Sequence, residues 1–257
     1  MNIEIITIAT HKEGRLEELI NNKYNIPIKV LGFGQKWTGF NMKNKLIYDY
    51  IQYMPDNKII IYVDGFDTEI KAPIKLAIER FKKKNYKLVF SKEVGSQLFY
   101  AEKMVFNKCR NNLIGNCGLY MGYVKYLRLF LHEALKNKCQ DDQVVMNNLC
   151  KKFHFIDIDE KEEIFQNLKI VNNYQYNNKA IFVGFPGTVS LKRGYRAIFE
   201  YGQFFIIPIL ILTIGILYFL LKNNNINKNK KYIMVSLITL LFIYLYLKMD
   251  YSCIMLN

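Results

Sequence analysis

The sequence predicts an α/β domain, a three-layer α/β/α sandwich of Rossmann type around a mostly parallel sheet, followed by two hydrophobic helices. Apolar runs typical of strands alternate with helical patterns along most of the chain. One run, Ile59 to Val63, has no polar alternation, as expected for a strand covered on both faces. Beyond residue 200 two uncharged apolar stretches, separated by the polar loop KNNNINKNKK, set the C-terminal part apart.

The elements of the α/β domain are expected in the following chain order. They are a strand in IEIITIAT, a helix in RLEELINN, a strand in IPIKVLGFG, a helix in NMKNKLIYDYIQYM, the strand IIIYV, a helix in IKLAIERFKKK, a strand in YKLVFSKEV, a strand or loop that passes into a helix in NCGLYMGYVKYLRLFLHEAL, a helix in DDQVVMNNLC and a strand in HFIDID. Helices are assigned where apolar residues recur at helical spacing, as at Met42, Leu46 and Tyr50. No Pro- or Ser-rich linker divides this part, so we expect one domain over residues 1–202.

Residues 203–257 are expected to form a membrane anchor of two helices, over 204–221 and 232–247. The first stretch, FFIIPILILTIGILYFLL, carries no charge, and a helix rising about 1.5 Å per residue can cross a hydrocarbon core of roughly 30 Å. The second stretch is shorter and spans only if its ends snorkel. A buried core helix is the alternative for the first stretch, and an interfacial segment is the alternative for the second.

The residues around this hairpin favour two opposite membrane orientations. The loop between the helices contains four lysines and no acid, which would place the loop in the cytoplasm and the domain outside. However, Lys192, Arg193 and Arg196 flank the first helix on its other side, and the chain starts in a strand pattern without features of a signal peptide. We therefore expect a cytosolic domain with a C-terminal anchor, with the lumenal orientation as the alternative.

The five cysteines and the net charge of +14 indicate which compartment and which binding partners to expect. The cysteines form no C-x-x-C pair and no obvious disulfide framework, which suits a reducing compartment. The positive charge could attract nucleic acid, anionic lipid or a phosphorylated substrate. Lysines are interleaved with asparagines and form no dense basic stripe, so we expect a solvated basic surface and no nucleic-acid partner.

Two carboxylates, Asp64 and Asp67, follow directly after the predicted buried strand. Ligands of open α/β sheets bind at the carboxyl ends of the strands, and a D-G-F-D turn can direct both acids at one point, with Gly65 supplying backbone freedom. Such a pair can hold a hard divalent cation beside phosphates. The alternative is an ordinary polar turn, with Asp67 capping the next helix.

Other chemistries are disfavoured by spacing. The three histidines show no triad pattern and no H-E-x-x-H, and the glycines of GFGQKWTG match neither a P-loop nor a dinucleotide fingerprint. An aspartyl-phosphate phosphatase would need acids two positions apart. A metal-assisted diphosphate site remains, in which Mn²⁺ or Mg²⁺ offsets charge on a departing nucleoside diphosphate and Lys43 or Lys192 assists. A sugar nucleotide is the donor that best suits this pattern.

Seven motifs, in order, give the chain a family resemblance. They are ITIATHKEGRLEELI, LGFGQKWTGFNMKNKLI, IIIYVDGFDTEI, LVFSKEV, GNCGLYMGYV, DDQVVMNNL and IFQNL. With these motifs the chain resembles the glycosyltransferase domain of procollagen lysyl hydroxylases and related collagen-type glycosyltransferases, over about residues 3–200. The resemblance implies a GT-A-like fold, a UDP-glucose or UDP-galactose donor with Mn²⁺ or Mg²⁺, and a hydroxyl acceptor such as protein hydroxylysine or a glycan.

The resemblance also implies roles for single residues. Thr10 and Phe66 stand where the family contacts the uridine, and Lys43 matches a lysine near the nucleotide. The metal-binding acids correspond to Asp64 and Asp67. Near the donor sugar and the reaction centre, the matching residues are Asn116, Cys117, Asp142 and Gln143. In the first turn of a helix, the acids of DDQ would also stabilise the helix dipole, so a purely structural role for them stays open.

The chain departs from the family at one point of the implied metal site. The family ends its domain with an H-G-N-G stretch whose histidine completes the metal site, whereas FVGFPGTV has Gly184 or a neighbour there and no histidine. Water or donor oxygens could take that coordination position. The alternative is a catalytically degenerate protein that binds nucleotide or a partner at a membrane.

Overall fold

The computed structural model describes residues 3–95, 105–186, 201–223, 227–249 and 251–253. The chain divides into two compact units, one built from residues 1–188 and one from residues 189–255. The first unit is an α/β structure and the second consists mainly of two helices.

The α/β unit is organised around a six-stranded sheet with the order β2-β1-β3-β6-β5-β7. Its strands are β1 (Ile3–Ile8), β2 (Ile28–Leu31), β3 (Ile59–Val63), β5 (Leu88–Lys92), β6 (Gly115–Tyr123) and β7 (Ile156–Ile158). Strand β6 runs antiparallel to both of its neighbours, and the other pairs are parallel. The expected mostly parallel sheet is therefore confirmed, and the residues at the ends of β1, β3 and β5 gather at one edge.

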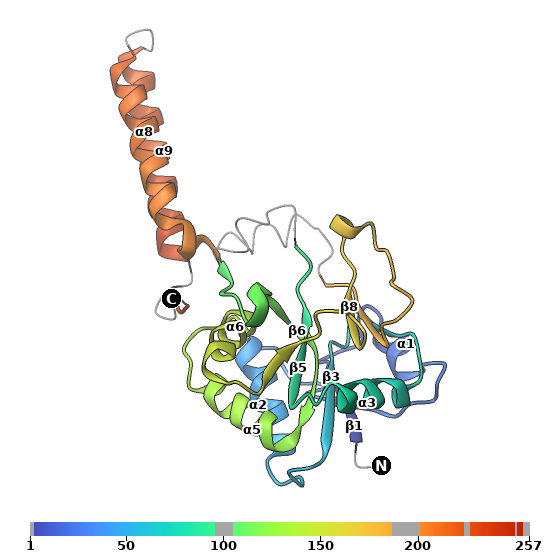
Figure 1. The fold of residues 1–257 in the computed structure, drawn as a ribbon. Helices are drawn as coiled ribbons and strands as arrows, with labels where there is room; N and C mark the ends of the chain where they lie inside the picture. Colours follow the sequence, from blue (N-terminus) through green and yellow to red (C-terminus); the bar gives the residue numbers. More distant parts are fainter. Residues whose placement is uncertain (1–2, 96–104, 187–200, 224–226, 250, 254–257) are drawn as a thin grey trace. The chain divides into compact units, whose positions relative to one another are not determined.

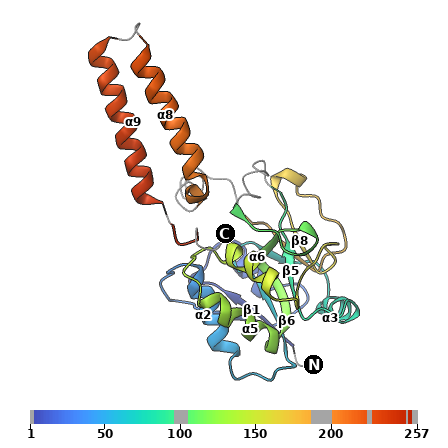
Figure 2. The same ribbon diagram turned by 60° about the vertical axis from the view of Figure 1, so that its left-hand side comes forward.

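Helices cover both faces of this sheet (Figures 1 and 2). One side carries α2 (Phe40–Ile51), α5 (Val124–Leu135) and α6 (Asp142–Lys152), and the other carries α1 (Leu16–Ile20) and α3 (Ile74–Lys83). Strand β3 is buried along its whole length, with Ile60 and Ile61 fully inaccessible to solvent. The unbroken apolar run in its sequence thus has the expected cause, since both faces lie against helices or other core residues.

A second, smaller sheet was not predicted. It has the order β4-β9-β8 and consists of three strands of three residues each, namely β4 (Thr68–Ile70), β8 (Phe165–Asn167) and β9 (Phe182–Gly184). Strand β4 begins directly after Asp67, so the expectation that Asp67 might cap a following helix is wrong. The next helix, α3, begins after Pro73 instead.

The expectation of a chain without disulfides is wrong. Cys109 and Cys150 form a disulfide with a Cα–Cα distance of 5.3 Å. The two cysteines are 41 positions apart, and only the fold brings the start of β6 beside the end of α6. Sequence patterns of disulfides rely on closely spaced cysteines, so no such pattern indicated this pair.

The C-terminal unit contains η3 (Gly202–Phe205), α8 (Ile206–Lys222) and α9 (Lys228–Lys248). The segments Gly202–Lys222 and Lys228–Lys248 are long and apolar enough to cross a membrane, by length and composition alone. Their apolar side chains are largely exposed, which is unusual for the core helices of a soluble protein. Lys192, Arg193 and Arg196, which entered the argument on orientation, lie outside the described residues.

Candidate active site

Asp64 lies directly beyond the carboxyl end of β3, in the first turn after the buried strand. The Tyr62 hydroxyl donates a hydrogen bond of 2.5 Å to Oδ1 of Asp64, and the Asp64 amide donates to the Gly118 carbonyl at 2.9 Å. A Cβ atom on Gly118 would lie 2.9 Å from Oδ2 of Asp64, so only glycine leaves room for this carboxylate. Burial raises the pKa of Asp64, while Lys43 and the Tyr62 hydroxyl act in the opposite direction.

Lys43 projects from helix α2 and joins two of the predicted site segments. Its ammonium forms an ion pair with Asp142 at the start of α6 and donates to the Cys117 carbonyl at 3.3 Å. Burial alone would lower the pKa of Lys43, but the carboxylates of Asp142 and Asp64 outweigh burial and raise it. The side chain therefore provides a fixed positive charge inside the site.

The two acids of the DDQ motif have different roles. The Asp141 carboxylate caps helix α6, since it accepts a hydrogen bond from the Val144 amide at 2.9 Å. Asp142, one residue further on, is instead directed at Lys43. Asp141 therefore has the purely structural role, which is to stabilise the start of the helix. Asp142 belongs to the buried group of charges around Lys43.

Glu93 is a site residue that the sequence analysis missed. Its side chain is only 5% exposed, and Oε2 accepts hydrogen bonds from the amides of Asn116 at 2.7 Å and Gln143 at 3.0 Å. Lys169 forms an ion pair with the other carboxylate oxygen. Glu93 follows the buried strand β5 just as Asp64 follows β3, and this shared pattern was the signal that could have identified it.

Thr10 and Phe66 lie together in a second, outer group. The Thr10 hydroxyl is 2.9 Å from Nδ1 of His11, and the imidazole of His11 lies 5.3 Å from the ring of Phe66 between centroids. The Phe66 carbonyl accepts a hydrogen bond from the Arg15 amide at 2.9 Å. The loop after β1 is thereby attached to the D-G-F-D turn. Thr10 and Phe66, the two residues expected to contact the uridine, therefore lie near each other.

Gly65 is needed in this turn for a reason other than the expected one. Its φ angle is not among the positive values of the described residues, so left-handed backbone freedom is not required. A Cβ atom at this position would lie 2.9 Å from Oγ1 of Thr7 and 3.1 Å from the Ile8 carbonyl. Close approach to strand β1 therefore excludes a larger residue.

The segment in which the resemblance implies a missing histidine runs beside the second acid. The Phe185 amide donates to the Asp67 carbonyl at 2.8 Å, and Gly184 pairs with Thr68 in the small sheet. A Cβ atom on Gly184 would lie 2.8 Å from Oδ1 of Asn167, so a side chain at this position requires Asn167 to move. Close packing of the small sheet thus disfavours a ligand side chain at Gly184 itself.

The described residues show which side chains could coordinate a metal ion at this site. Among the residues that the structure describes, no group of three or more His, Cys, Asp or Glu side chains could hold an ion. The turn contributes two carboxylates, Asp64 and Asp67, which are oxygen ligands of the kind that Mn²⁺ and Mg²⁺ accept. A cation here fits only if substrate and water oxygens supply most of its ligands. Lys192, the alternative basic residue, lies outside the described residues.

The predicted site residues thus fall into an inner and an outer group. The inner group combines Lys43, Asp64, Asn116, Cys117, Asp142 and Gln143 with Glu93 through the contacts given above. The outer group contains Thr10 and Phe66, with Asp67 in the turn between the groups. A buried ammonium, carboxylates and oriented amides at one sheet edge can bind a polar, anionic ligand and stabilise charge that develops on it.

Comparison with known proteins identifies relatives of the α/β unit. A family model described as the PLOD GT domain matches residues 1–180. "Procollagen-lysine,2-oxoglutarate 5-dioxygenase 2" from Mus musculus is 25% identical over 185 residues, which cover 64% of this chain and 25% of the mouse protein. "Multifunctional procollagen lysine hydroxylase and glycosyltransferase" from Caenorhabditis elegans is 26% identical over 186 residues, with 64% and 25% covered. The chain therefore spans about a quarter of the length of these relatives.

Proposed function

Because the chain belongs to the family of PLOD glycosyltransferase domains, we propose that it transfers a hexose from a UDP-sugar to a hydroxyl acceptor. The proposal includes the GT-A type of fold. The observation that carries it is the buried Lys43–Asp142 pair beside Asp64, at the edge where the strands of the sheet end. Glucose and galactose are the proposed sugars, and a protein hydroxylysine or a glycan is the proposed acceptor.

In this proposal the inner group binds the diphosphate and the donor sugar. Lys43 supplies a positive charge that favours a departing UDP, since charge grows on the diphosphate as the glycosidic bond breaks. Asp142 acts either as the base for the acceptor hydroxyl or as a contact to the donor sugar. Asn116 and Gln143, whose amides are oriented by Glu93, bind hydroxyl groups of the sugar.

A divalent cation, Mn²⁺ or Mg²⁺, is proposed to bind at Asp64 and Asp67. When bound, the ion would act as a Lewis acid on the leaving diphosphate. Burial of Asp64 supports this assignment, because a desolvated carboxylate gains most from a cation beside it. Thr10 and Phe66 are proposed to contact the uridine, which suits their position next to the D-G-F-D turn.

The competing proposal is a catalytically degenerate protein that binds nucleotide or a partner. Two observations favour it. Among the residues that the structure describes, no group of three or more metal-ligating side chains occurs, and the ammonium of Lys43 already interacts with the carboxylates of Asp142 and Asp64. Hydrolysis of a panel of UDP-sugars, with and without Mn²⁺, separates the two proposals. Turnover of at least one UDP-sugar supports the enzyme, whereas UDP binding without any turnover supports the degenerate protein.

The two C-terminal helices are proposed to anchor the domain to a membrane as a hairpin. Four lysines near the loop, at positions 222, 228, 230 and 231, favour a cytoplasmic loop. The Cys109–Cys150 disulfide favours an oxidising environment for the domain, because disulfides persist there. Together they favour a domain on the non-cytosolic side, in place of the cytosolic orientation expected from the sequence. Protease accessibility of the domain in sealed microsomes tests this orientation.

A further inference from the structure

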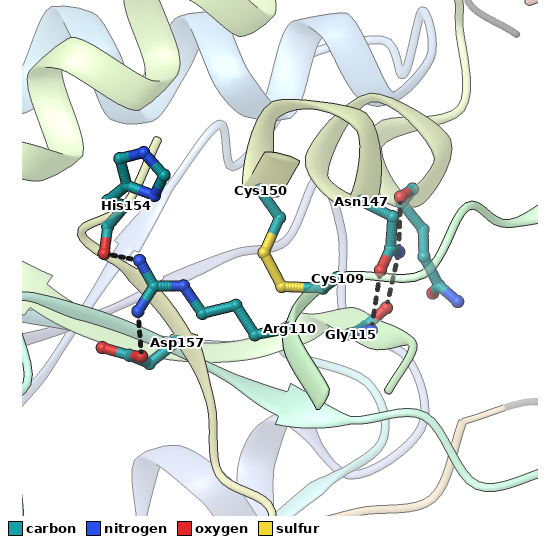
Figure 3. The surroundings of a disulfide bond; sticks show 8 residues. Cys109, Arg110, Gly115, Asn147, Cys150, His154 and Asp157 are labelled. Atoms are coloured by element: carbon teal, nitrogen blue, oxygen red, sulfur yellow. Dashed lines mark hydrogen bonds and ion pairs between the residues drawn. A yellow bond between two sulfur atoms is a disulfide. The ribbon is translucent and has the colours of Figure 1, made fainter. Parts of the chain in front are cut away.

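The Cys109–Cys150 disulfide closes a part of the chain that contains most of the inner group. Cys109 lies just before β6, and Cys150 lies in the last turn of α6 (Figure 3). Asn116 and Cys117 follow in β6, while Asp142 and Gln143 open α6. The covalent bond therefore joins the two elements that present these residues.

Three side chains on one face of α6 connect this helix to its surroundings. Gln143, Asn147 and Cys150 are four and three positions apart, so they lie on the same side of the helix. Gln143 bonds Glu93 at 3.0 Å, and the Asn147 amide bonds both the amide and the carbonyl of Gly115, at 2.8 and 3.0 Å. The disulfide is thus the covalent member of a row of three attachments.

The other end of the disulfide is itself fixed to the sheet. The Cys109 amide donates to the Leu113 carbonyl at 2.7 Å, which closes the turn before β6. Arg110 forms an ion pair with Asp157 of β7 at 3.1 Å and also donates to the His154 carbonyl (Figure 3). Through the disulfide, Cys150 is therefore linked to a turn that is itself fixed to strand β7.

We propose that the Cys109–Cys150 disulfide is a positioning device that holds α6 at the register in which Asp142 meets Lys43 and Gln143 meets Glu93. This inference rests on the proposed transferase function for its catalytic consequence. When the bond is reduced, α6 loses a covalent attachment and keeps only non-covalent ones, namely its hydrogen bonds, its ion pairs and its buried packing, so its first turn becomes more mobile. The proposed uridine contacts lie on other elements, as do Lys43, Asp64 and Asp67, which are proposed to hold the diphosphate and its cation. Reduction therefore affects sugar transfer and leaves UDP binding in place.

The test uses the full chain in detergent, with the Cys109→Ala/Cys150→Ala double variant and a reductant as two independent ways of removing the bond. Mass spectrometry of the unreduced wild type should find the two cysteine-containing peptides linked. Hydrogen exchange of residues 142–147 should quicken about tenfold or more in the double variant, while α3 keeps its exchange rate. The kcat for UDP-sugar hydrolysis should fall at least about fivefold, with the Kd for UDP unchanged.

Several controls keep the outcome decisive. Reductant should reproduce these effects in the wild type. Cys139 is also disulfide-bonded, so the effect of reductant on the double variant measures the contribution of that other bond, which is subtracted. If the double variant does not fold, mild reduction of the folded wild type and the Asn147→Leu variant, which removes the neighbouring attachment, carry the test. Alkylation of Cys109 and Cys150 as free thiols, or wild-type exchange and kcat after the bond is removed, would overturn the proposal. If no UDP-sugar is turned over at all, the proposed function fails, and the exchange rates still decide the positioning role.

Discussion

Lys43 and Asp142 form a buried ion pair between helix α2 and the first turn of α6, with side chains that are only 6% and 9% exposed. The lysine also lies close enough to Asp64 to raise its own pKa through that carboxylate. One ammonium therefore links three elements, and the charge of each partner is held in a place from which water is largely excluded.

Removing one partner of the pair should destabilise the domain strongly. Lys43→Met leaves Asp142 buried without its counter-ion, and a broken buried pair typically costs about 3–5 kcal/mol. Asp142→Asn should be costly for the same reason. The double variant should lose less than the sum of the two single losses, because no unpaired charge remains between them. Urea unfolding of all four proteins measures this coupling, and strictly additive losses would contradict it.

Glu93 should matter for turnover although it was not predicted as a site residue. Glu93→Gln retains the size of the side chain but removes the charge beside Lys169 and turns one acceptor oxygen into a donor. Asn116 and Gln143 should then lose their orientation, and misplacement of this kind can cost up to about 100-fold in kcat. Glu79→Gln, on the exposed surface of α3, is the matched control. Equal kcat values for both variants would rule out this role.

Restoring a histidine in β9 should fail to improve the site. Gly184→His places a side chain where a Cβ atom would already lie 2.8 Å from Oδ1 of Asn167 and 3.2 Å from Leu119. Overpacking of this kind costs about 1–3 kcal/mol. We expect a lower unfolding midpoint and no gain in Mn²⁺-dependent turnover, with Pro186→His, at a half-buried position, as the control. A stable Gly184→His protein with tighter Mn²⁺ binding would contradict the packing argument.

Glu133 should make stability depend on pH in the acid range. Hydrogen bonds from Lys136 and Lys152 lower the pKa of Glu133 from 4.5 to about 2. A carboxyl group whose pKa is lower in the folded state stabilises the protein above its unfolded pKa, and this contribution is lost as the pH falls through the folded pKa. Glu133→Gln should therefore flatten the decline of the thermal midpoint between about pH 4.5 and 2. Parallel curves for the variant and the wild type would show that the two lysines have no such effect.

Long apolar runs and helical spacing predicted the main elements, because burial of both faces leaves a direct trace in the sequence. Ile59 to Val63 is the clearest case, and its position also indicated where Asp64 would lie. The small sheet escaped prediction because strands of three residues, such as Phe182–Gly184, are too short to show a period.

Features that depend on pairing between distant segments could not be read from the sequence. Cys109 and Cys150 become neighbours only once β6 and α6 are in place. The division of roles between Asp141 and Asp142 depends on the single residue at which α6 begins, and helix boundaries are the least certain part of any pattern. The reason for Gly65 was likewise missed, since it depends on contact with β1.

The most direct test is a comparison of UDP-sugar hydrolysis by the wild type and by the variants Asp142→Asn, Asp64→Asn and Asp49→Asn, in the presence of Mn²⁺. The substitution is the same in each variant, but Asp49 lies on the surface of α2 and pairs with Lys45 at 2.7 Å, outside the cluster. The proposed function predicts wild-type turnover for Asp49→Asn and losses of about 100-fold or more for the other two. Turnover by the wild type that is unchanged in Asp142→Asn and Asp64→Asn would contradict the assignment of this cluster as the active site.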